Sequence, residues 1–206
     1  IIRGVKNRFG STNEVGIFDM TSQGLVAVDN PSGLFLAERP VDSSGSVVVP
    51  CIEGTRPLLV EIQALVAQTP FSGTPRRQAT GVDYQRFSII LAVLEKRQGY
   101  HLQTQDVFVN VAGGFKLTEP GVDLGIACAV ASSYRNRVIP PELAVIGEVG
   151  LSGEIRGVSQ IEARLKELAK LGFKRAVIPA VGGKVSSDIK VTQVKTISAA
   201  LEVVFS

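Results

Sequence analysis

Five basic side chains crowd one short stretch of the chain, and clustered arginines and lysines are the side chains that contact phosphate groups. Between Thr74 and Gly99 they are opposed only by Asp83 and Glu95. The five are Arg76, Arg77, Arg86, Lys96 and Arg97. Their excess of positive charge equals the formal net charge of +3 of the whole 206-residue chain. We therefore predict that they bind a polyanion, with pairing to carboxylates at subunit contacts as the alternative.

A second basic cluster lies near the start of the chain, and it consists of Lys6, Asn7, Arg8, Phe9 and Gly10. Two cations, an amide and an aromatic ring followed by glycine can reach a phosphate or a neighbouring subunit, but they cannot build a core. We interpret residues 1–14 as an arm or linker and residues 15–206 as one domain. Because the chain starts at Ile1 rather than Met, we expect an internal start.

The sequence disfavours most other kinds of catalytic or metal site. His101 is the single histidine, and Cys51 and Cys128 lie far apart without a CxxC pattern, so we expect no metal site and two buried, reduced thiols. Gly182-Gly183-Lys184 lacks the upstream glycine and the Ser or Thr of a phosphate-binding P-loop. No apolar run approaches the ~20 residues of a membrane-spanning helix, so we expect no membrane partner and a cytoplasmic location.

Hydrophobic periodicity and turn residues predict the elements that must position these side chains. We expect loops over 29–46 and 69–81. The expected elements are a hairpin over 15–28, strands over 47–49 and 58–65, a helix over 84–97, a strand over 107–112, a buried helix over 123–133, a strand over 143–146, a helix that follows Ser159 and runs to about 171, a strand over 175–178 and a helix near 198–203. Strands and helices mix without strict alternation, which favours an α+β fold.

Local signals fix the ends of two of these helices. Asp83 is a suitable N-cap for the helix over 84–97, and Ser159 with Glu162 matches a capping box for the helix that Gly172 ends. Arg86 and Arg97 are eleven residues apart, which is close to three turns, so we expect them on one side of their helix.

The Lys6–Gly10 cluster resembles the motif that follows the ATPase core in the bacterial RadA (Sms) family of recombination and repair proteins, and Ala92–Arg97 adds to this resemblance. The resemblance implies a DNA-dependent ATPase that forms a hexameric ring, drives branch migration of recombination intermediates and acts near the nucleoid with RecA-type recombinases or replication forks. Such proteins carry a zinc finger and an ATPase domain ahead of the motif. We therefore expect a C-terminal fragment without its own cofactor, with ATP, Mg and Zn bound by the missing parts.

From Asp106 to Pro179 the chain resembles the proteolytic domain of Lon, and the resemblance extends weakly back to the hairpin at Val15. The resemblance implies a Lon protease-like fold of the ribosomal protein S5 domain 2-like class. The matching pieces, in order, are the strand over 106–111, the stretch Thr118–Gly125, the turn Gly147–Gly153 and the strand that follows Gly172.

Lon-type proteases use a Ser-Lys dyad, and the resemblance places the two positions at Asp123 and Arg164. A carboxylate is no substitute for a nucleophilic hydroxyl, and a guanidinium does not deprotonate near neutral pH. We therefore expect the domain to be proteolytically inactive. One hypothesis pairs Asp123 with Arg164 across the old site, and the alternative makes Asp123 a helix cap.

Three functions follow from these observations. The favoured prediction is a DNA-binding and oligomerisation scaffold, in which the five clustered cations contact phosphates without reading sequence. A purely structural ring-forming domain without DNA contact is the second. The third is an active peptidase with an unusual dyad, for which the sequence offers Ser132, Ser133, Ser152 and Ser159, none in the expected motif.

Overall fold

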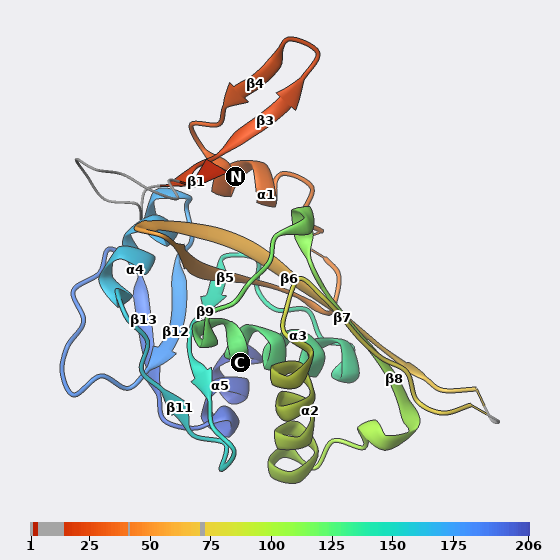
Figure 1. Ribbon diagram of the computed structural model, residues 1–206. Coiled ribbons are helices and arrows are strands. Elements are labelled where there is room, and N and C mark those ends of the chain that lie inside the picture. The colour runs from red at the N-terminus through yellow and green to blue at the C-terminus, as the bar shows by residue number, and fades with distance from the viewer. Residues whose placement is uncertain (1, 4–14, 41, 71–72) are drawn as a thin grey trace.

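The computed structural model describes residues 2–3, 15–40, 42–70 and 73–206 (Figure 1). The predicted phosphate or subunit motif at Lys6–Gly10 therefore lies outside the described residues. The two described residues of the predicted arm form β1 (Ile2–Arg3), which pairs antiparallel with β2 (Val15–Gly16).

A seven-stranded mixed sheet forms the centre of the molecule. In spatial order its strands are β13 (Lys190–Val194), β12 (Arg175–Pro179), β9 (Leu143–Val145), β5 (Ser46–Glu53), β6 (Arg56–Gln68), β8 (Gln105–Val111) and β7 (Arg77–Thr80). The pairs β5–β6 and β6–β8 are antiparallel, and the other neighbours are parallel. This mixture agrees with the predicted lack of strict strand–helix alternation.

Helices cover both faces of the sheet and create two apolar cores (Figure 1). On one face pack α2 (Tyr84–Gln98), α3 (Asp123–Arg135) and α5 (Ile197–Val204). On the other face pack α1 (Pro31–Leu36) and α4 (Ile161–Lys170). Strand residues alternate between the cores: Val60 and Ile62 of β6 face α3, whereas Leu59 belongs to the core beside α4.

The central helix α3 owes its position to small and apolar side chains. Its first ten residues are all buried, as the sequence predicts. Gly125 lies directly against β5, because a Cβ at this position would collide with Val49 Cγ1. Only a glycine permits this close approach of helix and sheet.

The α2 prediction is also confirmed in detail. The side chain of Asp83 accepts a hydrogen bond from the Arg86 amide at 2.9 Å, and Phe87, Ile90 and Leu94 are buried. Gly99 follows with φ +69°, the left-handed conformation that ends a helix.

Three local predictions were wrong. The predicted loop over 29–46 contains α1, because the Asn30 side chain accepts from the Gly33 amide and Pro31 occupies the first turn. The predicted loop over 69–81 contains β7, which gains parallel hydrogen bonds from β8. The capping box is not formed: Gln160 stands at the N-cap with φ +55° and caps nothing with its side chain, and Ser159 contributes its carbonyl to another contact.

Two short hairpins complete the fold. β3 (Phe18–Thr21) and β4 (Gly24–Ala27) confirm the predicted hairpin and project away from the sheet (Figure 1). β10 (Glu148–Val149) and β11 (Ile155–Arg156) form a second hairpin beside α3. Among the described residues, no helix has the length and apolar character needed to cross a membrane.

Candidate nucleic-acid interface

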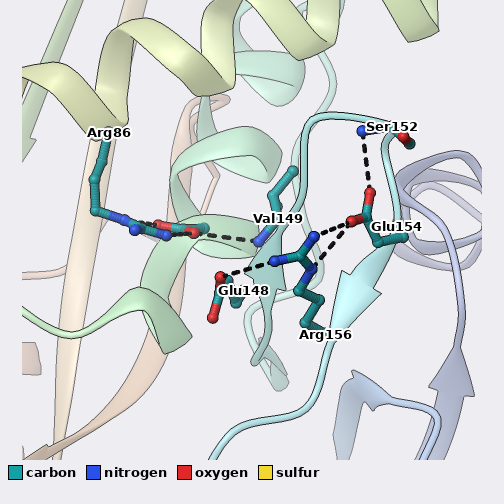
Figure 2. A network of polar contacts seen from close by, with 7 residues as sticks. Arg86, Glu148, Val149, Ser152, Glu154 and Arg156 are labelled. Carbon is teal, nitrogen blue, oxygen red and sulfur yellow. Dashed lines mark hydrogen bonds and ion pairs between the residues drawn. The ribbon is translucent and has the colours of Figure 1, made fainter.

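Two of the residues singled out in the sequence meet in an ion pair: Arg86 of α2 and Asp123 at the start of α3 (Figure 2). Arg86 Nε lies 2.9 Å from Asp123 Oδ1, and Arg86 Nη2 binds Oδ2. The Asp123 carboxylate is buried and also accepts from the Val149 amide at 3.2 Å. Burial raises the pKa of Asp123, and the Arg86 hydrogen bonds act in the opposite direction. Arg86 is therefore committed to a structural contact.

Arg164 pairs with a different carboxylate. Its guanidinium donates from Nη1 and Nη2 to the two oxygens of Glu119 at 2.8 and 2.6 Å, and from Nη1 to the Pro50 carbonyl at 2.7 Å. The Arg164 side chain is 0% exposed. Glu119 also accepts from the Ile52 amide, so one carboxylate joins the turn η3 (Pro120–Val122), β5 and α4.

The hypothesised pair between Asp123 and Arg164 is therefore wrong. Each side chain has other hydrogen-bond partners. Asp123 accepts from Arg86 and the Val149 amide, and Arg164 donates to Glu119 and to two backbone carbonyls. The alternative, Asp123 as a helix cap, is wrong as well. Asp123 is the first helical residue, and its carboxylate binds the β10 backbone rather than amides of α3.

The hairpin β10–β11 borders the ion pair with further charges (Figure 2). Arg156 lies 2.6 Å from Glu154 and 3.9 Å from Glu148. Together with Arg86 and Asp123 these residues line a cavity of about 280 Å³. Three carboxylates oppose two guanidinium groups there, so this cavity does not attract phosphate.

Arg76 just precedes the edge strand β7 and Arg77 begins it, and the side chain of each makes defined contacts. The Arg76 guanidinium lies 2.7 Å from Asp106 and 5.4 Å from the centre of the Phe108 ring. The backbone amide of Arg76 is the main cause that lowers the pKa of Asp106. Arg77 donates to the carbonyls of Leu102, at 2.5 Å, and Gln105. Arg76 nevertheless remains 68% exposed, so its guanidinium still reaches solvent.

Lys96 and Arg97 occupy the last turn of α2 and are exposed, as a phosphate contact requires. The side predicted to be shared by Arg86 and Arg97 faces the β10–β11 hairpin. Arg86 and Val149 line the same cavity, and a Cβ on Gly153 would lie 3.4 Å from Arg97 Cγ. The carboxylates of this hairpin pair with Arg156, and Arg86 pairs with Asp123 of α3. None of the ion pairs among the described residues includes Arg97.

The structure adds two cations that the sequence reasoning missed, Arg135 and Arg137 at the end of α3. The ring of Tyr100, just after α2, stacks on Tyr134 with 4.6 Å between centroids, and this contact joins the ends of both helices. Arg135 lies over Tyr100 at 5.3 Å. Arg137 lies over Phe205 at 5.3 Å and donates to the carbonyl of the same residue. Both arginines are exposed.

We call this surface the basic end. It comprises the exposed or half-exposed cations at or just after the ends of α2 and α3 and at the start of β7, namely Arg77, Lys96, Arg97, Arg135 and Arg137. None of the ion pairs found among the described residues uses these side chains. The one sequence signal for the two missed members was Tyr134-Arg135-Asn136-Arg137, a polar run that follows a buried helix.

Comparison with known proteins gives two findings. Residues 67–181 match the family model described as "Subunit ChlI of Mg-chelatase". The chain is also 57% identical over 206 residues to the DNA repair protein RadA of Halalkalibacterium halodurans, and 55% identical over 204 residues to that of Bacillus subtilis. The RadA of Streptococcus pneumoniae is 51% identical over 209 residues.

These matches cover nearly all of this chain, 98% in the first two cases and 100% in the third. The chain spans about half the length of the curated relatives, 45%, 44% and 50% respectively. The predicted resemblance to RadA is thereby confirmed, whereas the Lon-like assignment stays a prediction. The chain belongs to the ChlI family of the matched model, and over nearly its whole length its sequence is that of a RadA-type DNA repair protein.

Proposed function

We propose that this chain is a DNA-binding and self-assembling scaffold within a RadA-type DNA repair protein, and that DNA contacts the basic end. The observation that carries this proposal is the convergence of two helix ends and one strand on a surface with exposed cations and without ion pairs among the described residues.

Contacts from such a surface would be to the phosphate backbone. Arginine and lysine neutralise phosphates and release counterions, so binding should depend steeply on salt and little on sequence. The aromatic rings of the basic end support its arginines rather than DNA bases, because Tyr100 and Phe205 are themselves buried.

The two dyad positions support a scaffold rather than a peptidase. Asp123 forms an ion pair with Arg86, and Arg164 forms one with Glu119. Neither side chain can serve as a nucleophilic hydroxyl or as a neutral base. They hold α2 to α3 and α4 to β5, respectively.

Activities of the whole protein belong to this proposal only as expectations from the RadA family: DNA-dependent ATP hydrolysis, branch migration, a hexameric ring and zinc binding. The residues of this chain do not fit those cofactors. Burial raises the pKa of the Cys51 and Cys128 thiols to about 12, which disfavours the thiolate that zinc requires. The sequence also has no P-loop motif that would bind ATP and Mg.

The first prediction concerns the salt dependence of DNA binding. We expect the K96Q/R97Q variant to bind a short labelled duplex more weakly than the wild-type chain. Its log–log salt slope should be smaller by about 2, because each lost phosphate contact removes about 0.9. Fluorescence anisotropy across a salt series measures both quantities.

The matched control removes two charges from α4, where Lys166 and Lys170 are exposed on the other face of the sheet. The K166Q/K170Q variant should bind DNA like the wild type. Equal weakening by both variants would mean that only net charge matters. No binding by the wild-type chain at low salt would favour the structural ring without DNA contact.

A further inference from the structure

A cavity of about 1000 Å³ separates the β3–β4 hairpin and α1 from the sheet. Its lining residues come from four separate parts of the chain, which the fold brings together. They belong to the hairpin region around Phe18, to α1 and the residues just after it, to β5 and β6, and to residues 112–116, which include the turn η2 (Ala112–Gly114).

Aromatic rings form the apolar part of these walls. Phe35 packs edge-on against Phe115 with 5.6 Å between ring centroids, and Phe18 lies at the hairpin side. Gly113 lets Phe35 approach the backbone, since a Cβ there would lie 3.0 Å from its ring. The cavity therefore has aromatic walls that can pack against the stem of a long side chain.

The described residues that line the cavity carry a net negative charge, in a chain whose net charge is positive. Among them Asp19, Glu38 and Glu61 carry carboxylates, as does Glu53, which has a contact of its own, and Lys116 is the single cation. Glu61 is 2% exposed, and its carboxylate accepts from Ser46 Oγ at 2.5 Å and Gln63 Nε2 at 3.1 Å. Phosphate is repelled here, whereas a guanidinium or ammonium group is attracted.

An exposed apolar strip continues from the cavity along the hairpin. Phe18 and Met20 share one strand face, and their cross-strand partners are Ala27 and Leu25. Met20 is 72% exposed and Leu25 56%. Among the described residues the strands pair only with each other, and the hairpin stands free of the sheet (Figure 1). Contiguous exposed apolar side chains of this kind indicate an interaction surface.

We propose that this hairpin groove, the cavity together with Phe18, Met20 and Leu25, binds an extended segment of a partner protein in which a basic side chain is flanked by apolar ones. The basic side chain enters the cavity, where the exposed carboxylates of Asp19 and Glu38 face it and the phenylalanine rings pack against its stem. The apolar side chains of the segment lie on the hairpin strip. The groove is separate from the basic end, so one domain holds DNA and a protein partner at different surfaces.

The test uses two labelled nine-residue peptides that differ only at the central position. Each has leucines on both sides of the centre, with arginine in one peptide and glutamate in its twin. We expect the full chain to bind the arginine peptide with a dissociation constant at least about tenfold lower than that of the glutamate peptide. Fluorescence anisotropy measures both constants.

Two exposed-site variants and two matched controls locate the binding. M20S/L25S and D19N/E38Q should each weaken the arginine peptide severalfold, whereas L151S on the β10–β11 turn and E202Q on α5 should not, although these residues are also exposed. Circular dichroism verifies that each variant is folded. The proposal would be overturned if the two peptides bound equally or if neither showed saturable binding. It would also be overturned if M20S/L25S lost self-association but still bound the arginine peptide.

Discussion

Replacing Arg164 with alanine should lower the free energy of unfolding by about 3–5 kcal/mol, the range for breaking a buried ion pair. The Arg164 side chain is fully buried, and its guanidinium satisfies Glu119 and the carbonyls of Pro50 and Ser159. Alanine leaves those acceptors without their donor and opens a cavity among α4, β5 and η3. Urea denaturation monitored by circular dichroism measures this loss.

Two further variants separate the ion pair from simple truncation. Lys166→Ala, two residues away on the exposed side of α4, should change stability by less than about 0.5 kcal/mol. Arg164→Met combined with Glu119→Gln removes both charges and should recover part of the loss. A loss below about 1 kcal/mol for Arg164→Ala would contradict a structural role for the Arg164 ion pair.

The second large effect is expected at the Arg86–Asp123 pair. Arg86→Met leaves a buried carboxylate with the Val149 amide as its remaining described partner, so stability should fall by about 2–3 kcal/mol at pH 8. Asp123→Asn keeps the shape and removes the charge. A double-mutant cycle of the two should give a coupling energy of about 1–3 kcal/mol, because the groups are in direct contact.

The sign of the pH dependence gives this prediction a second readout. Burial already raises the pKa of Asp123, and loss of Arg86 removes the main opposing cause. An acid whose folded-state pKa exceeds its unfolded value binds its proton more tightly in the folded state. The deficit of Arg86→Met should therefore shrink as the pH falls from 8 toward about 4, the unfolded pKa of aspartate. A constant deficit, or a coupling energy near zero, would show that the pair is incidental.

Local signals in the sequence were sufficient for much of the fold. Asp83 and Gly99 define α2 because caps act within one turn, and the unbroken apolar run after Asp123 predicts a buried helix. α1 was missed because six residues are too few to show a helical period. The Ser159 capping box failed because α4 begins one residue later than it requires, with Gln160 at the N-cap in the left-handed conformation.

The partners within the candidate sites were beyond the reach of sequence reasoning. We predicted a pair between Asp123 and Arg164 because a family resemblance placed them in one dyad. In the structure, α2 packs on α3, and Arg86 of α2 is the ion-pair partner of Asp123. Arg135 joins the basic end because it lies over Tyr100, which stacks on Tyr134, and Arg137 because it lies over Phe205. Both contacts join residues far apart in the chain. Charge counting within one stretch cannot detect such a surface.

Lysine footprinting with and without DNA tests the central claim most directly. The folded chain is acetylated briefly in low salt, alone or saturated with a short duplex, and the modified lysines are quantified by mass spectrometry. We expect DNA to protect Lys96 in the basic end and to leave Lys166 and Lys170 on α4 as reactive as before. Protection of the α4 lysines with Lys96 unchanged would contradict DNA binding at the basic end.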